Sequence, residues 1–450
     1  MIKTLNCSFG DAFSESVGSD MYSWCEDLFP INRSLTGAGV RETLRYLSGL
    51  VQDLQIMSID SGERVFDWIV PEEWNIWAAY IEDESGERVI DITDNNLHVV
   101  GYSTAVDKIL SLDELKLHLH TLPDQPDLIP YVTSYYEKNW GFCLSQNQLN
   151  EMPKGRYRAV IKSKHKKGSL LYGELIIPST GRTREEIFIS TYICHPSMAN
   201  NELSGPVVTT ALIRALQALP HRRYNYRIIF IPETIGSIVY LSRHLQDLKN
   251  NTVAGFNVTC VGDDRAYSLL PSRLGNTLSD AAARNTLGAM EPNYIEYPWT
   301  ERGSDERQYC HPGIDLPVAS IMRTKYGEYP EYHTSADKLG DVVTADGLLG
   351  GYTALLQTIE AIEKNFYPVS VSLGEPQLGR RGLYPQLSTL ERSKSADLLL
   401  HVLTWADGRH SLIDIAEKAG CAVKDLYEPA KILLGESLIT AEIRPKDEDL

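Results

Sequence analysis

The 450-residue sequence has no apolar run approaching the roughly 18 or more residues that a membrane-spanning helix needs. Its N-terminus lacks an apolar stretch followed by a small-residue cleavage site, so we expect no secretory signal. The seven cysteines are scattered, odd in number and never spaced as Cys-x-x-Cys. These absences predict reduced thiols in a cytoplasmic protein, and they argue against both a disulfide framework and a thiolate zinc site.

Positive charge is also scarce. The chain has 43 Lys and Arg against 60 Asp and Glu, which gives a formal net charge of −17. Because phosphate contacts dominate nonspecific nucleic-acid binding, this balance argues against such binding by the whole chain. An apolar content of 43% is ordinary for a soluble globular protein, and the length allows two or three domains.

Changes in residue pattern divide the chain into four parts. Residues 1–62 have apolar residues spaced near 3.6, which predicts helices. Residues 63–156 are rich in short strand and turn patterns and predict an inserted β-rich domain. Residues 157–370 alternate β-type and helical runs, which is typical of an α/β fold with a doubly wound, mostly parallel sheet. Residues 371–450 hold a Gly/Pro-rich linker, three short amphipathic helices and a strand, which predict a winged helix-turn-helix.

The loop that follows the apolar run 187–193 carries several metal-binding residue types. His195 stands just after the run, and Asn201 and Glu202 follow a few residues later. Ligands in open α/β sheets bind at the carboxyl ends of strands, and His with oxygen donors can hold zinc. We therefore predict half of a metal site here; the alternative is a hydrogen-bonded structural histidine.

Two further acidic positions follow apolar β-type runs. Glu233 comes directly after such a run and is a candidate general base, whose pKa burial should raise. The alternative is a helix N-terminal Glu that interacts with the macrodipole. Asp263 and Asp264 end the next run beside Arg265. They are candidates to ligate metal or bind a substrate amine, or they pair with Arg265.

Polar loops flank the last predicted strand of the sheet. One contains Asp305, and the other contains Tyr332, His333 and Asp337. If the second loop is helical from residue 335, Asp337 could orient His333 by accepting a hydrogen bond from its ring, as an outer partner of a metal ligand does. Metal ligation is predicted for His195, Asn201, Glu202, Asp263 and His333, and catalysis for Glu233 and Asp305. Predicted substrate contacts are Asp264, Arg265, Tyr332 and, from an aromatic-rich segment outside the sheet, Trp140.

The order of these motifs resembles a known family. His195, Asn-x-x-x-Ser-Gly, Glu-x-x-Gly, Ser-Asp and His-Thr-x-x-Asp follow one another as in the zinc aminopeptidases of family M28. More closely, the chain resembles bacterial aminopeptidase-like proteins associated with polysaccharide biosynthesis, which have an inserted β domain and a C-terminal winged helix. Long segments carry this second resemblance: 28–37, 67–71, 96–103, 134–143 and 232–238.

The resemblance implies a zinc-peptidase-like fold and a set of roles. His195 and His333 match metal ligands, Glu233 matches the catalytic Glu, and Asp305 matches an acid near the site. Three positions depart from the pattern. Asn201 stands where an Asp bridges two metals, and Thr234 stands where a second Glu binds metal. The usual Asp of the following strand falls near Thr259, although Asp263 lies just beyond. A neutral amide is a poor bridge between cations, so one zinc ion is favoured over two.

Two classes of function remain open from the sequence. The first is a zinc-dependent aminopeptidase or related amide hydrolase that acts on peptide or aminoacyl substrates. The second is a non-catalytic binding or regulatory protein that uses the winged helix for contact with protein rather than DNA. A homo-oligomer is compatible with either.

Overall fold

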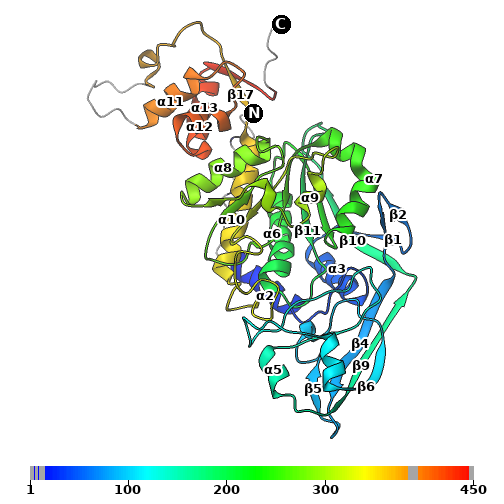
Figure 1. Ribbon diagram of the computed structural model, residues 1–450. Coiled ribbons are helices and arrows are strands. Elements are labelled where there is room, and N and C mark those ends of the chain that lie inside the picture. Colours follow the sequence, from blue (N-terminus) through cyan, green and yellow to red (C-terminus); the bar gives the residue numbers. More distant parts are fainter. Residues whose placement is uncertain (1–4, 6–8, 10–15, 384–393, 445–450) are drawn as a thin grey trace.

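The protein, as a computed structural model, is described for residues 5, 9, 16–383 and 394–444. Its three parts follow one another along the molecule (Figure 1). The β-rich module lies at one end, the α/β domain in the middle and the winged helix at the other end. Among the helices of these described ranges, none is long and apolar enough to cross a membrane.

The α/β domain is built on a sheet with the strand order β1-β10-β12-β11-β13-β16-β14-β15. The central strands β12, β11, β13 and β16 run parallel, as the alternating pattern predicts. β10 pairs antiparallel with both β1 and β12, and β14 pairs antiparallel with β16. The bounds are β1 Gln55–Asp60, β10 Ser169–Ile177, β11 Glu186–Tyr192, β12 Asn225–Ile231, β13 Thr252–Asn257, β14 Ser268–Leu270, β15 Ile295–Glu296 and β16 Val318–Met322.

Helices cover both faces of this sheet, so its central strands are buried on both sides (Figure 1). Ile187 and Ile189 of β11 join the core of one face, and Phe188 between them joins the core of the other. Burial of each such side chain stabilises the fold by about 1.5–3 kcal/mol. The first face packs on α2 Ser16–Leu28, α3 Ala38–Leu50, α6 Ser204–Ala218, α8 Leu278–Met290 and α10 Ala345–Lys364; the second packs on α7 Ile235–Asn251 and α9 Glu306–Tyr309.

The β-rich module has its own four-stranded sheet, ordered β5-β4-β9-β6. Its strand β9 spans Arg156–Lys166, so this sheet extends past the boundary predicted at residue 156. The reason is that β9 pairs along its length with β4 and β6 before the chain returns to the main sheet. The other elements are β2 Arg64–Val65, β3 Trp68–Ile69, β4 Glu73–Glu82, β5 Arg88–Asp91, β6 Val106–Ser111, α4 Leu112–Leu115, β7 Leu119–His120, β8 Phe142–Cys143 and α5 Gln146–Glu151.

The winged helix packs on one end of the α/β domain. Its strand β18 pairs with β17, so the unit begins before the boundary predicted at residue 371. Ser411 caps the second helix, α12, in a capping box with Asp414. The bounds are β17 Tyr367–Ser370, α11 Lys394–Thr404, α12 Leu412–Ala419, η7 Val423–Leu426, α13 Tyr427–Gly435 and β18 Ile439–Glu442.

Candidate functional site

His195 stands at the carboxyl end of the buried strand β11, where the sheet topology predicts a ligand site. The chain then passes through Ser197, which has φ +42°, into the π-helical turn η4, Ala199–Leu203. Such turns and positive φ values at non-glycine residues recur at functional sites. Asn201 and Glu202 lie in this turn and are buried.

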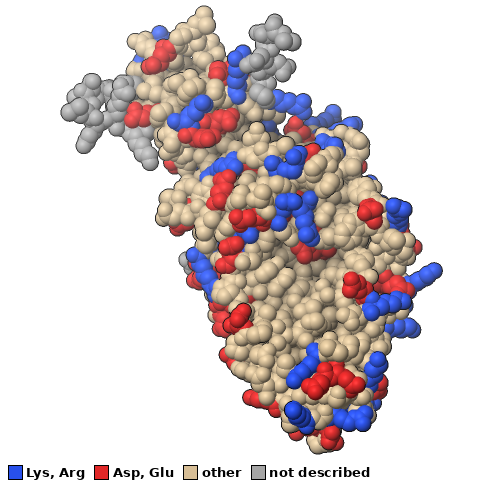
Figure 2. Space-filling view, in the orientation of Figure 1, with Lys and Arg blue, Asp and Glu red and all other residues tan. Residues whose placement is uncertain are grey.

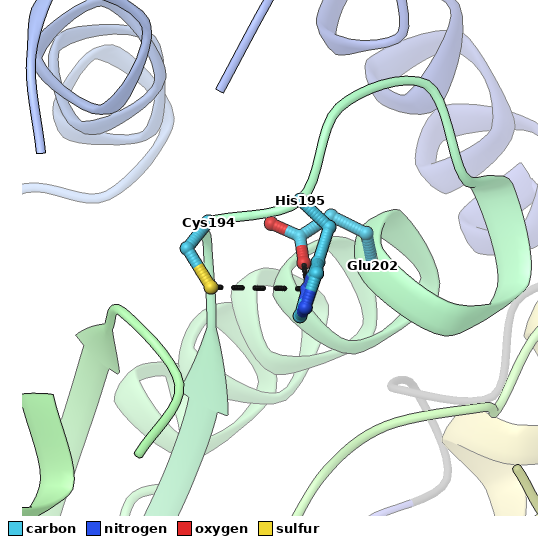
Figure 3. Close-up of side chains that lie close together, drawn as sticks. All are labelled: Cys194, His195 and Glu202. Carbon is cyan, nitrogen blue, oxygen red and sulfur yellow. Dashed lines mark hydrogen bonds and ion pairs between the residues drawn. The ribbon is translucent and has the colours of Figure 1, made fainter. Parts of the chain in front are cut away.

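One nitrogen of the His195 ring faces a buried carboxylate. Nδ1 lies 2.7 Å from Oε2 of Glu202 and 3.7 Å from Sγ of Cys194 (Figure 3). Ligand atoms of these three side chains lie within 4.8 Å of one another, so the trio could in principle hold a metal. Arg33 stands beside it, with Nε 3.6 Å from Oε1 of Glu202. Burial raises the pKa of the Cys194 thiol to about 11, so the thiol is protonated at neutral pH.

The other nitrogen of the ring faces the candidate catalytic residues. Nε2 of His195 lies 3.4 Å from Oε2 of Glu233, whose side chain is 21% exposed. The rings of His195 and His333 lie 5.9 Å apart between centroids. Tyr131 of the β-rich module packs edge-on against both rings, at 5.2 and 5.1 Å, and Tyr332 stacks on His333 at 3.9 Å. The structure therefore brings three predicted residues, His195, Glu233 and His333, to one place.

The pKa of Glu233 shifts in the direction opposite to the one expected from the sequence. Burial favours a higher pKa, but contact with His195 outweighs it and lowers the pKa of Glu233. The expected increase is therefore wrong for the metal-free site, because the imidazole next to the carboxylate holds a proton. Burial opposes that proton, yet the Glu202 carboxylate beside Nδ1 raises the pKa of His195 well above its usual value. Burial and the nearby His195 lower the pKa of His333 to about 3, so this ring is neutral and free to bind metal.

Residues of the α9 segment hold the turn that carries Glu233. Thr234 has φ +64°, and its N–H donates to Oδ1 of Asp305 at 2.7 Å. Nη2 of Arg307 donates to Oγ1 of Thr234 at 2.6 Å. Burial and the nearby Glu233 raise the pKa of Asp305 to about 8. Asp305 thus positions the turn that carries Glu233, whereas the sequence predicted a catalytic role for it.

Asn201 contributes an unmatched acceptor. Its Nδ2 donates to the Tyr192 hydroxyl at 2.9 Å, while its buried Oδ1 has no hydrogen-bond partner among the described residues. A buried carbonyl oxygen without a partner costs about 1–3 kcal/mol. A cation would remove this cost. The amide is thus compatible with the single-metal site predicted for it.

Other predicted site residues have internal partners. The Asp263 carboxylate accepts from Nδ2 of Asn200 and from N and Oγ1 of Thr324, and Arg265 pairs with Glu331. Trp140 stacks on His118 within the β-rich module, at 3.7 Å.

Asp264, a predicted substrate contact, is exposed. Asp337 accepts from N of Asn200 and N of Asn201, so it shapes η4 and does not orient His333. The reason is that the chain after His333 forms turns rather than the helix on which that expectation depended.

Four residues near the site were missed by the sequence reasoning. Cys194 and Arg307 are within two residues of predicted site residues, but no sequence motif indicates a role for either of them in the site. Tyr131 comes from the module, which sequence alone could not place against the sheet. Arg33 lies inside a segment, 28–37, that carried the family resemblance, so that segment was the available clue.

The chain also matches known families along most of its length. Residues 22–365 match a family described as a domain of unknown function, DUF4910, and residues 365–441 match a winged helix-turn-helix family. A Clostridium acetobutylicum protein, provisionally named a polysaccharide biosynthesis protein with an aminopeptidase-like domain, is 43% identical over 431 residues. That alignment covers 95% of this chain and 97% of the relative.

Solved structures with a similar fold include proteins described as peptidases. A Clostridium acetobutylicum crystal structure, provisionally described as a peptidase, superposes with TM-score 0.88 at 42% identity, covering 95% of this chain and 97% of that one. The Bacillus subtilis zinc aminopeptidase BSAP superposes with TM-score 0.56 at 11% identity, over 76% and 93% of the two chains. A Shewanella amazonensis peptidase M28 precursor gives 0.57 at 12%, over 80% and 96%. At such low identity the last two show a shared fold.

The fold defines the class: an aminopeptidase-like α/β fold, shared with the M28 zinc aminopeptidases, with a C-terminal winged helix. Within that class, the chain belongs to the DUF4910 family.

Proposed function

We propose that the protein is a metal-dependent amide hydrolase of the aminopeptidase type, with one zinc ion and Glu233 as general base. One observation carries the proposal. Nε2 of His195 faces the Glu233 carboxylate at 3.4 Å, beside the neutral ring of His333. A peptide or aminoacyl amide is the proposed substrate, by analogy with the fold.

We assign one zinc ion to the Nε2 side of His195, where Glu233 lies. His195 and His333 would supply imidazoles, and Oδ1 of Asn201, which has no hydrogen-bond partner among the described residues, would supply an oxygen. Three protein ligands suffice for a catalytic zinc. The opposite side, with Cys194 and Glu202, is less suited because Arg33 places a positive charge there.

A bound zinc ion would polarise the scissile carbonyl and acidify water. The chain's own residues supply the rest. Glu233, ionised at neutral pH, takes a proton from water at Oε2 and delivers it to the leaving amine nitrogen. Asp305 and Arg307 hold the turn that aims this carboxylate. Tyr131 and Tyr332 pack on the two imidazoles and exclude water from that side of the site.

Metal content and turnover test the proposal. Purified protein should bind one equivalent of zinc and hydrolyse aminoacyl amides. Asn201→Ala should lower zinc affinity, whereas Asn257→Ala, at another buried asparagine whose Oδ1 has no partner among the described residues, should leave it unchanged. Protein that binds no zinc and is inert toward aminoacyl and peptide amides with added metal would exclude this function.

A second candidate is a non-catalytic binding protein, and the neutral Asn201 and Thr234 favour it. Its winged helix would contact protein rather than DNA, because η7 and the start of α13, the second helix of the helix-turn-helix, are docked on the α/β domain. N of Val423 donates to Oδ1 of Asn285 on α8, and Tyr427 packs against the ammonium of Lys364 on α10. The leading residues of that helix contact bases in helix-turn-helix complexes. On the face in Figure 2, Lys and Arg are interspersed with Asp and Glu.

A further inference from the structure

The N-terminal segment 28–37 carries the family resemblance, yet the proposed chemistry uses none of it. In the structure this segment contacts the loop that carries His195 and Ser197. Arg33 within it is 1% exposed, although arginine is seldom fully buried unless it is paired. Such burial calls for a specific set of partners.

Arg33 contacts both His195 and the carboxylate that holds His195. Its Nε donates to the carbonyl oxygen of His195 at 2.9 Å and lies 3.6 Å from Oε1 of Glu202. The other oxygen of Glu202 is the one that faces Nδ1 of His195, at 2.7 Å. Nη1 of Arg33 donates at 2.6 Å to the carbonyl oxygen of Leu28, the last residue of α2. One guanidinium therefore joins the end of a helix, the site loop and its carboxylate.

A second segment holds the same loop from the β-rich module. Nδ2 of Asn96 donates to the carbonyl oxygen of Pro30 at 3.0 Å and to Oγ of Ser197 at 2.8 Å. Asn96 also belongs to a segment that carried the family resemblance. The loop after His195 is thus held from two directions, by the segment between α2 and α3 and by the β-rich module.

The charge of Arg33 is needed because Glu202 is wholly buried, with a side-chain exposure of 0%. A buried carboxylate without a compensating cation is strongly disfavoured. As an anion, Glu202 accepts from Nδ1–H of His195 and leaves Nε2 as the metal-binding nitrogen. A partner of this kind fixes the tautomer and raises the basicity of a ligating imidazole.

We propose that Arg33 is a positioning residue for His195, which acts through Glu202 to present Nε2 toward Glu233 and His333. Where metal is concerned, the inference rests on the proposed function. The geometry of the imidazole itself does not depend on it.

Zinc affinity measured by competition with a chromophoric chelator tests the inference. Arg33→Met should weaken zinc binding by about 10–100-fold, the range typical of lost outer partners. Arg33→Lys should recover part of this loss, because it keeps the charge but not the planar fork. The matched control is Arg227→Met, which removes another buried arginine, paired with Glu174 and Glu186. Wild-type affinity in Arg33→Met, or an equal loss in Arg227→Met, would overturn the proposal.

Imidazole nitrogen NMR of the metal-free protein separates this inference from the proposed function. Even if the wild type binds no zinc, its His195 should carry a proton on Nδ1 against Glu202, and Arg33→Met should shift that resonance while Arg227→Met should not. If Arg33→Met does not fold, Arg33→Lys gives the same readout with a smaller shift. An unchanged His195 spectrum in the Arg33 variants contradicts the inference.

Discussion

Nε2 of His195 and Oε2 of Glu233 lie 3.4 Å apart, although the residues follow two different strands, β11 and β12. The strands are parallel neighbours, so their carboxyl ends meet at one edge of the sheet. Because of this pairing, a histidine at the end of one strand and a carboxylate at the end of the next lie close enough to act in the same reaction.

Glu233→Gln should abolish hydrolysis while zinc remains bound, because the amide cannot accept the proton. We expect a loss of about 10²–10⁴-fold in kcat, the usual contribution of a general base. Asp264→Asn is the control, since Asp264 is an exposed acid near the site loops. Steady-state kinetics with zinc analysis check both. Retained activity in Glu233→Gln would remove Glu233 from the chemistry.

Zinc binding should release a proton and tighten with increasing pH. The pKa of His195 is raised in the metal-free site, so its imidazole is protonated at neutral pH and zinc must displace that proton. Below the raised pKa of His195 the affinity should rise about tenfold per pH unit, which corresponds to one proton per ion. His333 adds no proton in this range, since its pKa is about 3. Calorimetry in buffers of different ionisation enthalpy measures the number released; a value of zero contradicts the assignment.

Asp305 should make the protein less stable as pH rises. Burial and Glu233 raise its folded pKa to about 8, above its usual value, so the folded state binds more protons than the unfolded state between about pH 4 and 8. The free energy of unfolding contributed by this group therefore falls across that window. Asp305→Asn should flatten this part of the curve in urea unfolding. The same slope in the variant and the wild type would show that Asp305 is not the titrating group.

Asn285 should hold the winged helix on the α/β domain. Its Nδ2 donates to the carbonyl oxygen of Cys421, and its Oδ1 accepts from N of Val423. Asn285→Ala leaves both backbone groups without these partners, at a cost of about 1–3 kcal/mol. Hydrogen exchange should accelerate in residues 412–435 but not in α7. The exposed Asn293→Ala serves as control, and unchanged exchange in Asn285→Ala contradicts this role.

Much of the architecture could be predicted from the order of residue patterns. The alternation of runs such as 187–193 and 226–231 predicted parallel strands, and His195 and Glu233 at their ends predicted the site. Module boundaries were less accurate, because β9 continues the module sheet after the chain pattern has already changed. Strand pairing is a long-range property that local pattern does not record.

The details of the site were predictable only in part. Residue type and strand-end position identified His195, Glu233 and His333 but could not distinguish a site acid from one with internal hydrogen bonds. Asp263 and Asp337 have the right type and position, yet their oxygens are occupied by Thr324 and by backbone amides of η4. Arg33 is far from His195 in sequence, and only the folded chain shows that its charge balances Glu202.

Anomalous diffraction at the zinc absorption edge, from crystals grown with zinc, tests the central claim most directly. The account predicts one peak per chain, in contact with Nε2 of His195, His333 and Oδ1 of Asn201. A peak on the opposite side of the ring, between Cys194 and Glu202, or no peak at His195, would contradict it.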